Sequence, residues 1–199
     1  MILYFDTETT GLRPGHIIQL AYILDYGDNV IAKNFYFKVE YIEPSAMAVH
    51  GITLEKLNTL SGGKVFYDHI NEIEKDFLSA DLLVAHNFTF DFYFMVNEFK
   101  LNFKQFQFKE SFDTMKYFTP ILKLPTERGK HLKYPKLNEL FTYFDVYPFE
   151  IAKFCQEKFN LSIDHPHDAA FDTAAMFLAV KNACEKISEL EEKLSKYLN

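Results

Sequence analysis

Hydrophobic and polar positions alternate with two different periods along this chain of 199 residues. Short apolar runs bounded by turn residues are typical of strands, whereas apolar residues spaced three and four apart predict helices. We therefore expect strands over residues 2–5, 16–26, 30–39 and 81–86. We expect helices over residues 67–79, 88–101, 114–122, 136–144, 149–159 and 168–186, with short helices around Pro44 and Gly51.

This order of elements predicts an α/β fold. Three consecutive strands joined by short turns favour antiparallel pairing, and the later strands, separated by helices, favour parallel pairing. The expected architecture is a mixed sheet flanked by helices, in one domain over residues 1–184. At 48% hydrophobic residues, the chain can bury a large core.

Residues 185–199 form a separate pattern. Apolar side chains recur there at spacings of three and four, which predicts an amphipathic helix: Ile187, Leu190, Leu194 and Tyr197. This C-terminal helix either packs on the same domain or docks onto a second copy, a polymerase or a repair protein. We expect packing on the same domain.

Two carboxylates follow the first strand. Alternation along a strand places Asp6 and Glu8 on the same side, roughly 6.6 Å apart at two strand rises. At that spacing they can share one metal ion or bridge two ions ~3.5–4 Å apart. The simpler alternative is an exposed acidic strand end.

Two further carboxylates lie where an apolar residue is expected. Asp91 borders an apolar helical stripe, and Asp172 shares a helical face with small residues. Isolated charges are costly to bury, so carboxylates that converge need cations. Oxygen ligands favour Mg²⁺ or Mn²⁺ over zinc.

His167 precedes Asp172 by five positions, about 7.5 Å along a helix axis. That distance lets a histidine stand beside a metal ion without ligating it. Its ordinary pKa, about 6.5, suits a general base. The alternative is an ordinary surface or core histidine.

Taken together, these segments resemble the DEDDh branch of the DnaQ-like 3′–5′ exonucleases. The resemblance spans residues 1–183. It rests on Phe5-Asp6-Thr7-Glu8-Thr9-Thr10-Gly11-Leu12, on His86-Asn87 through Asp91, on His167 through Asp172, and on Val49-His50-Gly51-Ile52-Thr53.

The resemblance implies a ribonuclease H-like fold and hydrolysis with two divalent cations, Mg²⁺ or Mn²⁺. Asp6, Glu8 and Asp172 would hold the ion that carries the attacking water. Asp6 would also bridge to the second ion, which Asp91 would support and which would stabilise the leaving 3′ oxygen. His167 would accept the proton, and the product would be a nucleoside 5′-monophosphate.

The substrate would be nucleic acid with a free 3′ end, with single-stranded or frayed DNA favoured over RNA. The resemblance implies these substrate-binding residues: Thr10, Gly11, Leu12, His50, His86, Asn87 and Phe90. An RNA-trimming exoribonuclease is the first alternative. A non-catalytic binding module is the second, but such a module would be expected to lack one of the five catalytic residues.

The formal charge of −7 is unusual for a nucleic-acid-binding protein. Two bound divalent cations would offset more than half of it. Basic residues also cluster at Lys123, Arg128, Lys130, His131, Lys133 and Lys136. We expect Lys130 and Lys133 to contact phosphates, although a solvated loop would have the same composition.

The sequence also favours a cytoplasmic protein. No apolar run reaches the length of a membrane span, and no basic leader precedes the first strand. Cys155 and Cys184 are too few for a disulfide framework.

Overall fold

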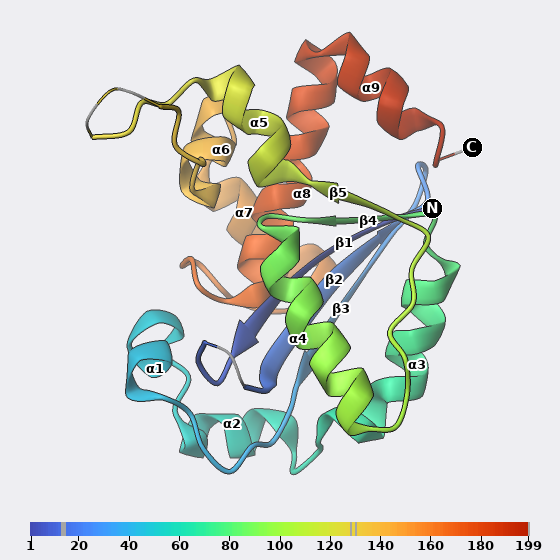
Figure 1. Cartoon of the computed structure of the whole chain (residues 1–199), viewed down its shortest axis with the longest axis vertical. Helices are drawn as coiled ribbons and strands as arrows, with labels where there is room; N and C mark the ends of the chain where they lie inside the picture. Colours follow the sequence, from blue (N-terminus) through green and yellow to red (C-terminus); the bar gives the residue numbers. More distant parts are fainter. Residues whose placement is uncertain (13–14, 128, 130, 199) are drawn as a thin grey trace.

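The computed structural model describes residues 1–12, 15–127, 129 and 131–198. A five-stranded mixed sheet crosses its centre in the order β3-β2-β1-β4-β5 (Figure 1). The strands are β1 (Ile2–Thr9), β2 (Ile17–Asp25), β3 (Val30–Tyr36), β4 (Leu82–Ala85) and β5 (Glu110–Asp113). β1 pairs antiparallel with β2 and parallel with β4, which confirms the predicted mixed α/β sheet.

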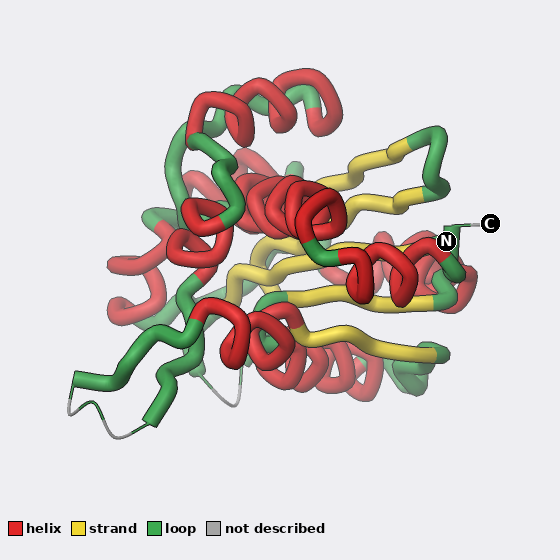
Figure 2. Tube along the Cα trace, turned by 90° about the horizontal axis from the view of Figure 1, so that it is seen from above, coloured by secondary structure: helices red, strands yellow, loops and turns green. Residues whose placement is uncertain are grey.

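Helices cover both faces of this sheet (Figure 2). They are α1 (Pro44–His50), α2 (Leu54–Ser61), α3 (Phe66–Ser79), α4 (Phe88–Leu101), α5 (Thr114–Leu122), α6 (Leu137–Tyr143), α7 (Pro148–Phe154), α8 (Ala169–Lys186) and α9 (Ser188–Ser195). A π-helical turn, η1 (Cys155–Phe159), follows α7 directly. None of the helices in the described ranges is both long and apolar enough to span a bilayer.

The central strand β1 divides the core in two. Ile2 and Tyr4 pack in the cluster that contains the apolar face of α8. Leu3 and Phe5 point the other way, into an aromatic cluster formed with α3 and α4. Side chains alternate between faces along a strand, so Asp6 and Glu8 continue the α8 side and Thr7 continues the α4 side.

Four elements differ from the sequence prediction. The strand expected over residues 2–5 continues to Thr9. The pattern of residues 110–113 did not indicate a strand, because only Phe112 of the edge strand β5 is buried and no alternation results. The helix expected over residues 149–159 changes to π-helical geometry at Cys155. The strand expected over residues 30–39 ends at Tyr36.

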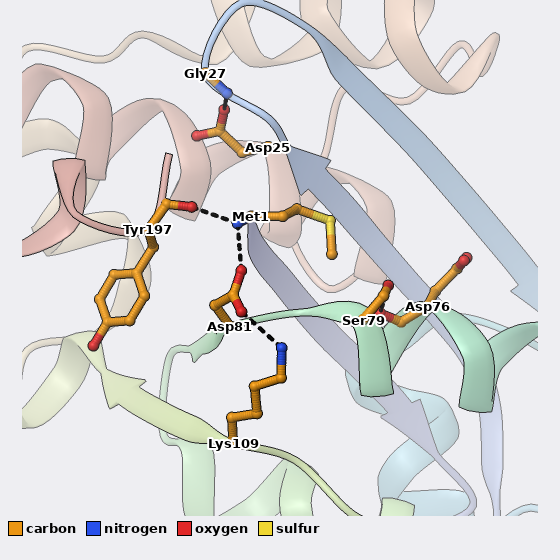
Figure 3. Close-up of polar contacts among 8 residues, drawn as sticks. All are labelled: Met1, Asp25, Gly27, Asp76, Ser79, Asp81, Lys109 and Tyr197. Carbon is orange, nitrogen blue, oxygen red and sulfur yellow. Dashed lines mark hydrogen bonds and ion pairs between the residues drawn. The ribbon is translucent and has the colours of Figure 1, made fainter. Parts of the chain in front are cut away.

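The start of β1 contacts the C-terminal segment (Figure 3). This contact lies at the opposite end of β1 from Asp6 and Glu8. The Met1 amino group donates to the Asp81 carboxylate at 2.8 Å and to the Tyr197 carbonyl oxygen. Lys109 also pairs with Asp81 at 2.7 Å. Leu190 and Leu194 of α9 are buried in the same core cluster as α8. The domain boundary at residue 184 stays a prediction.

Candidate active site

A cavity of about 390 Å³ opens where β1 ends. All five predicted catalytic residues line it, although they come from β1, α4, α8 and the loop before α8. The cavity is lined by Asp6, Thr7, Glu8, Thr9, Gly11, Leu12, Ser45, Ala46, Val49, His50, His86, Phe90, Asp91, His167 and Asp172.

One group of possible ligand atoms in the described part of the chain joins β1 to the start of α8, and it does not include Asp6 or Asp91. One carboxylate oxygen each from Glu8 and Asp172 and one ring nitrogen of His167 lie within 4.8 Å of one another. The His167 backbone N–H also donates to Asp172 Oδ2 at 3.2 Å. His167 therefore stands within reach of a metal ion held by Glu8 and Asp172, so a ligand role competes with the predicted base role.

Asp91 is buried and is held by a residue that the sequence analysis missed. Thr7 donates to Asp91 Oδ1 twice, from its backbone N–H at 3.1 Å and from its hydroxyl at 2.7 Å. The signal was present in the alternation of β1, because Thr7 lies between two carboxylates and faces the α4 side. Its two bonds orient the Asp91 carboxyl group at the cavity.

Burial and mutual repulsion perturb all four carboxyl groups. Burial raises the pKa of Asp6 well above its ordinary range, and the charges of Asp91, Asp172, Glu8 and Asp168 add to this effect. Burial likewise raises the pKa of Glu8, with Asp172 the largest charge effect.

The same cause acts on the other two carboxyl groups. Burial raises the pKa of Asp91 to about 7 even though the bonds from Thr7 oppose the shift. Burial also raises the pKa of Asp172 to about 7, against the bond from the His167 amide.

This donor set fits divalent metal ions. Across residues 1–12, 15–127, 129 and 131–198, no Lys or Arg forms an ion pair with these four carboxylates. Buried carboxylates need a compensating cation, and carboxylate oxygens are the ligands that Mg²⁺ and Mn²⁺ prefer. The arrangement thus has the chemistry of a metal centre.

Several predicted substrate-binding residues lie around the same cavity. Gly11 and the exposed side chain of Leu12 follow β1, and Phe90 comes from the first turn of α4. His50 ends α1, where its Nδ1 accepts from the Ile52 N–H at 3.0 Å. Burial lowers the pKa of His50, and a hydrogen bond with the Thr9 backbone opposes this shift.

His86 lines the cavity with both ring nitrogens already engaged. Nδ1 lies 3.0 Å from Thr114 Oγ1, and Nε2 lies 3.0 Å from the Pro135 carbonyl oxygen. Burial lowers the pKa of His86. The residue therefore ties the cavity wall to the segment before α6.

Other predicted binding residues do not line this cavity. Thr10 faces a neighbouring cavity of about 750 Å³, and its hydroxyl accepts from the His16 N–H at 2.9 Å. Asn87 has a left-handed backbone (φ 73°), and its N–H donates to Asp113 Oδ1 at 3.3 Å. Lys133 belongs to the projecting loop between α5 and α6 (Figure 1) and pairs with Glu139 of α6. Lys130 lies outside the described residues.

Four further lining residues were not predicted as site residues. They are Thr9 at the end of β1 and three residues of α1: Ser45, Ala46 and Val49. A short helix of small and apolar residues has no chemical signature. Only the resemblance of the segment from Val49 onward pointed toward this wall.

The chain is similar to a known protein family and to several known proteins. Residues 3–180 match the RNase_T family, described as exonuclease. The chain is 35% identical to DNA polymerase III subunit epsilon of Salmonella typhimurium over 109 residues, 50% of this chain and 43% of that protein. It is 31% identical to the epsilon subunit of Pasteurella multocida over 108 residues, 49% of this chain and 41% of that protein.

A longer match covers most of this chain. The PolC-type DNA polymerase III of Streptococcus thermophilus is 29% identical over 206 residues, which is 94% of this chain and 12% of that protein. The chain therefore spans less than half the length of each of these curated relatives.

A solved structure shares the fold. Escherichia coli Exonuclease I, solved in complex with a dT13 oligonucleotide, superimposes with a TM-score of 0.73 at 20% sequence identity. The alignment covers 100% of this chain and 44% of that one. This likeness confirms the predicted ribonuclease H-like fold.

Proposed function

Because the chain belongs to the RNase_T exonuclease family, which matches residues 3–180, we propose that it is a metal-dependent 3′–5′ exonuclease releasing nucleoside 5′-monophosphates. The expected kinship with DnaQ-like DEDDh exonucleases is confirmed by this match and by the epsilon subunits. One observation supports the proposed activity most directly. A single cavity collects Asp6, Glu8, Asp91, Asp172 and His167 from segments far apart in the sequence.

Asp6, Glu8 and Asp172 are the proposed holders of one divalent cation, and Asp6 with Asp91 of a second. Bound Mg²⁺ or Mn²⁺ would supply an activated water and stabilisation of the leaving 3′ oxygen. The charges of both Asp91 and Asp172 raise the pKa of Asp6, which is consistent with a position between the two. The two bonds from Thr7 keep the Asp91 carboxyl group oriented toward the cavity.

His167 is the proposed proton acceptor. Its side chain is exposed at the cavity, so the ring can release the proton to solvent after each turnover. The backbone bond to Asp172 keeps the histidine beside the carboxylates. General-base catalysis of this kind contributes roughly 10²–10⁴-fold in rate.

The terminal nucleotide is the proposed occupant of the cavity. Its volume of about 390 Å³ is that of a small-ligand site. Leu12, Val49 and Phe90 offer apolar contacts to a base. This lining favours one unpaired nucleotide at a free 3′ end.

DNA is the favoured substrate class, since the epsilon subunits and PolC carry the name DNA polymerase III and Exonuclease I was solved with a dT13 oligonucleotide. A polymerase or repair protein is the corresponding partner, and the cytoplasm the proposed location. Residues 1–184 are the proposed exonuclease domain, with residues 185–199 packed on it.

The test is digestion of 5′-labelled single-stranded DNA in Mg²⁺, Mn²⁺ or EDTA. We expect stepwise shortening from the 3′ end, no cleavage when that end carries a phosphate, and none with EDTA or with the Asp6→Asn variant. Fragments released from a circular substrate would contradict the exonuclease proposal.

Matched duplex DNA and RNA oligonucleotides define the substrate. Faster digestion of RNA than of DNA would replace the favoured substrate by the exoribonuclease alternative. Metal-dependent binding of DNA and RNA without any cleavage would instead indicate the non-catalytic module.

A further inference from the structure

A row of polar side chains crosses three strands beside the proposed metal centre. Glu8 of β1 lies directly opposite Gln19 of β2, and Gln19 lies opposite Tyr36 of β3. Directly opposed residues point to the same face of a sheet. Gln19 is fully buried, so each of its polar atoms needs a partner.

Gln19 uses both ends of its amide on the segment that starts α8. Its Nε2 donates to Asp168 Oδ1 at 3.0 Å, and its Oε1 accepts from the Ala169 N–H at 3.2 Å. The same Nε2 lies 3.0 Å from Asn34 Oδ1 and 3.1 Å from the Tyr36 hydroxyl oxygen. Strands β2 and β3 therefore hold the Gln19 amide in place, and this amide in turn holds the start of α8.

Asp168 connects Gln19 to the proposed catalytic residues on either side of it, His167 and Asp172. Its Oδ1 accepts from the Ala170 N–H at 2.9 Å, which caps α8, and its carbonyl oxygen accepts from the Asp172 N–H at 2.9 Å. On its other side, His167 has a left-handed backbone with φ 63°. A non-glycine residue keeps that conformation only where its surroundings hold it.

We propose that Gln19 and Asp168 are positioning residues that hold His167 and Asp172 in register with Glu8. This inference rests on the proposed exonuclease function and names two residues that act on its site without touching the substrate. Both side chains act by hydrogen bonds, so their geometry matters more than the charge of Asp168.

Asp168 could instead act as a further metal ligand. Its hydrogen bonds oppose this role. Its Oδ1 accepts from Gln19 and from Ala170, and its Oδ2 lies 3.4 Å from the Tyr36 hydroxyl, so both carboxylate oxygens already have partners.

The test compares four variants of the full chain by kcat, KM and Mn²⁺ affinity. Gln19→Leu removes the amide at nearly constant size, and Asp168→Ala removes the acceptor. Asp168→Asn keeps an oxygen at the Oδ1 position. Thr173→Val is the matched control, since it removes another buried bond between α8 and β2, from the Thr173 hydroxyl to the Ala21 carbonyl oxygen.

We expect Gln19→Leu and Asp168→Ala to lower kcat about 10–100-fold, the usual effect of residues that orient a metal site, with KM changed less than about threefold. Asp168→Asn should keep at least about a third of the wild-type kcat, and Thr173→Val should stay within about twofold. Hydrogen exchange at the amides of residues 168–172 should speed up only in the first two variants.

Each other outcome overturns the proposal. An unchanged kcat in Gln19→Leu contradicts it, as does an equal loss in Thr173→Val, which would indicate general destabilisation. An Asp168→Asn variant as inactive as Asp168→Ala would show that charge is required. If Gln19→Leu does not fold, the comparison of Asp168→Ala with Asp168→Asn tests the proposal.

The two proposals fail separately. An inactive wild-type protein would reject the proposed function. Faster amide exchange at residues 168–172 in Gln19→Leu, but not in Thr173→Val, would still establish the anchorage of α8.

Discussion

The position of His167 in the cavity is compatible with two different roles, general base and metal ligand. A ring nitrogen of this exposed side chain lies within 4.8 Å of possible ligand atoms of Glu8 and Asp172. A general base and a metal ligand need the same neighbourhood but differ in what their removal does. A base can be removed while the ion stays bound, whereas a ligand cannot.

Replacing His167 by alanine should lower kcat by roughly 10²–10⁴-fold, the usual contribution of a general base. Binding of Mn²⁺, measured by isothermal titration calorimetry, should stay near the wild-type value. Asp6→Ala is the comparison variant and should lose both activity and metal affinity. If His167→Ala folds normally but no longer binds Mn²⁺, the histidine is a ligand and the base assignment is wrong.

Two elements beyond the cavity, the loop between α5 and α6 and the helix α9, can be tested separately. The loop between α5 and α6 projects from the body of the protein (Figure 1), and its sequence contains five of the 21 lysines and arginines. Its two arms are joined by a bridge between Pro125 and Leu132, and His86 contacts the carbonyl oxygen of Pro135 at its base. A strand of nucleic acid leaving the cavity past His86 would meet this loop.

Neutralising this loop by Lys130→Ala with Lys133→Ala should weaken binding similarly for all sequences, because phosphates carry no sequence information. The slope of log K against log salt should fall by about one unit for each phosphate that the loop no longer neutralises. Lys104→Ala is the control, since Lys104 also pairs with a glutamate but lies away from the cavity. An unchanged slope in the double variant would support the alternative, in which the loop is solvated and contacts no phosphates.

The C-terminal helix α9 belongs to the core cluster of α8 rather than to an open surface. Leu190 is fully buried and Leu194 nearly so. Burying a leucine contributes about 1.5–3 kcal/mol. This burial supports packing of residues 185–199 on the same domain over docking to a partner.

Truncation before Ser188 should therefore lower the thermal midpoint of the monomer clearly. Leu190→Ala alone should cost about 2–5 kcal/mol in the free energy of unfolding, as other buried leucines do. Glu192→Ala, on the exposed side of the same helix, should cost little. A truncated protein with wild-type stability that no longer forms a dimer or binds a partner would support docking instead.

At the scale of the whole molecule, the fold concentrates negative charge at one end of the sheet. Burial raises the pKa of Asp91 and of Asp172 to about 7, whereas an aspartate in an unfolded chain titrates near 3.9. Without metal, these two groups therefore bind more protons in the folded protein than in the unfolded chain between about pH 4 and pH 7. Their contribution to stability falls as the pH rises through that window.

Metal-free protein should accordingly unfold at a lower temperature at pH 8 than at pH 6. Added Mn²⁺ should raise the midpoint more at pH 8, because the ion replaces the missing protons. Differential scanning calorimetry in EDTA and in Mn²⁺ measures both effects. His16 shifts stability in the same direction, since a bond to Glu98 raises its pKa, so the Asp91→Asn variant is needed to isolate the carboxylates. Equal midpoints at the two pH values without metal would contradict this account.

The sequence alone predicted most of the elements and the five proposed catalytic residues. Periodicity is local, so it predicted every helix of the catalytic core and four of the five strands, but not β5, which has too few buried positions. The five proposed catalytic residues lie in short motifs whose order and spacing indicated a family, and the family match confirms that kinship.

Only the tertiary structure decided how those residues are held. Thr7 reaches Asp91 across 84 positions of sequence, and Gln19 reaches Asp168 across 149. Thr10 and Asn87 stand in family-like motifs, yet neither lines the catalytic cavity. The physical reason is the range of the interactions. A repeat pattern records which face of an element is buried, whereas the partner of a buried polar atom depends on which distant element packs against that face.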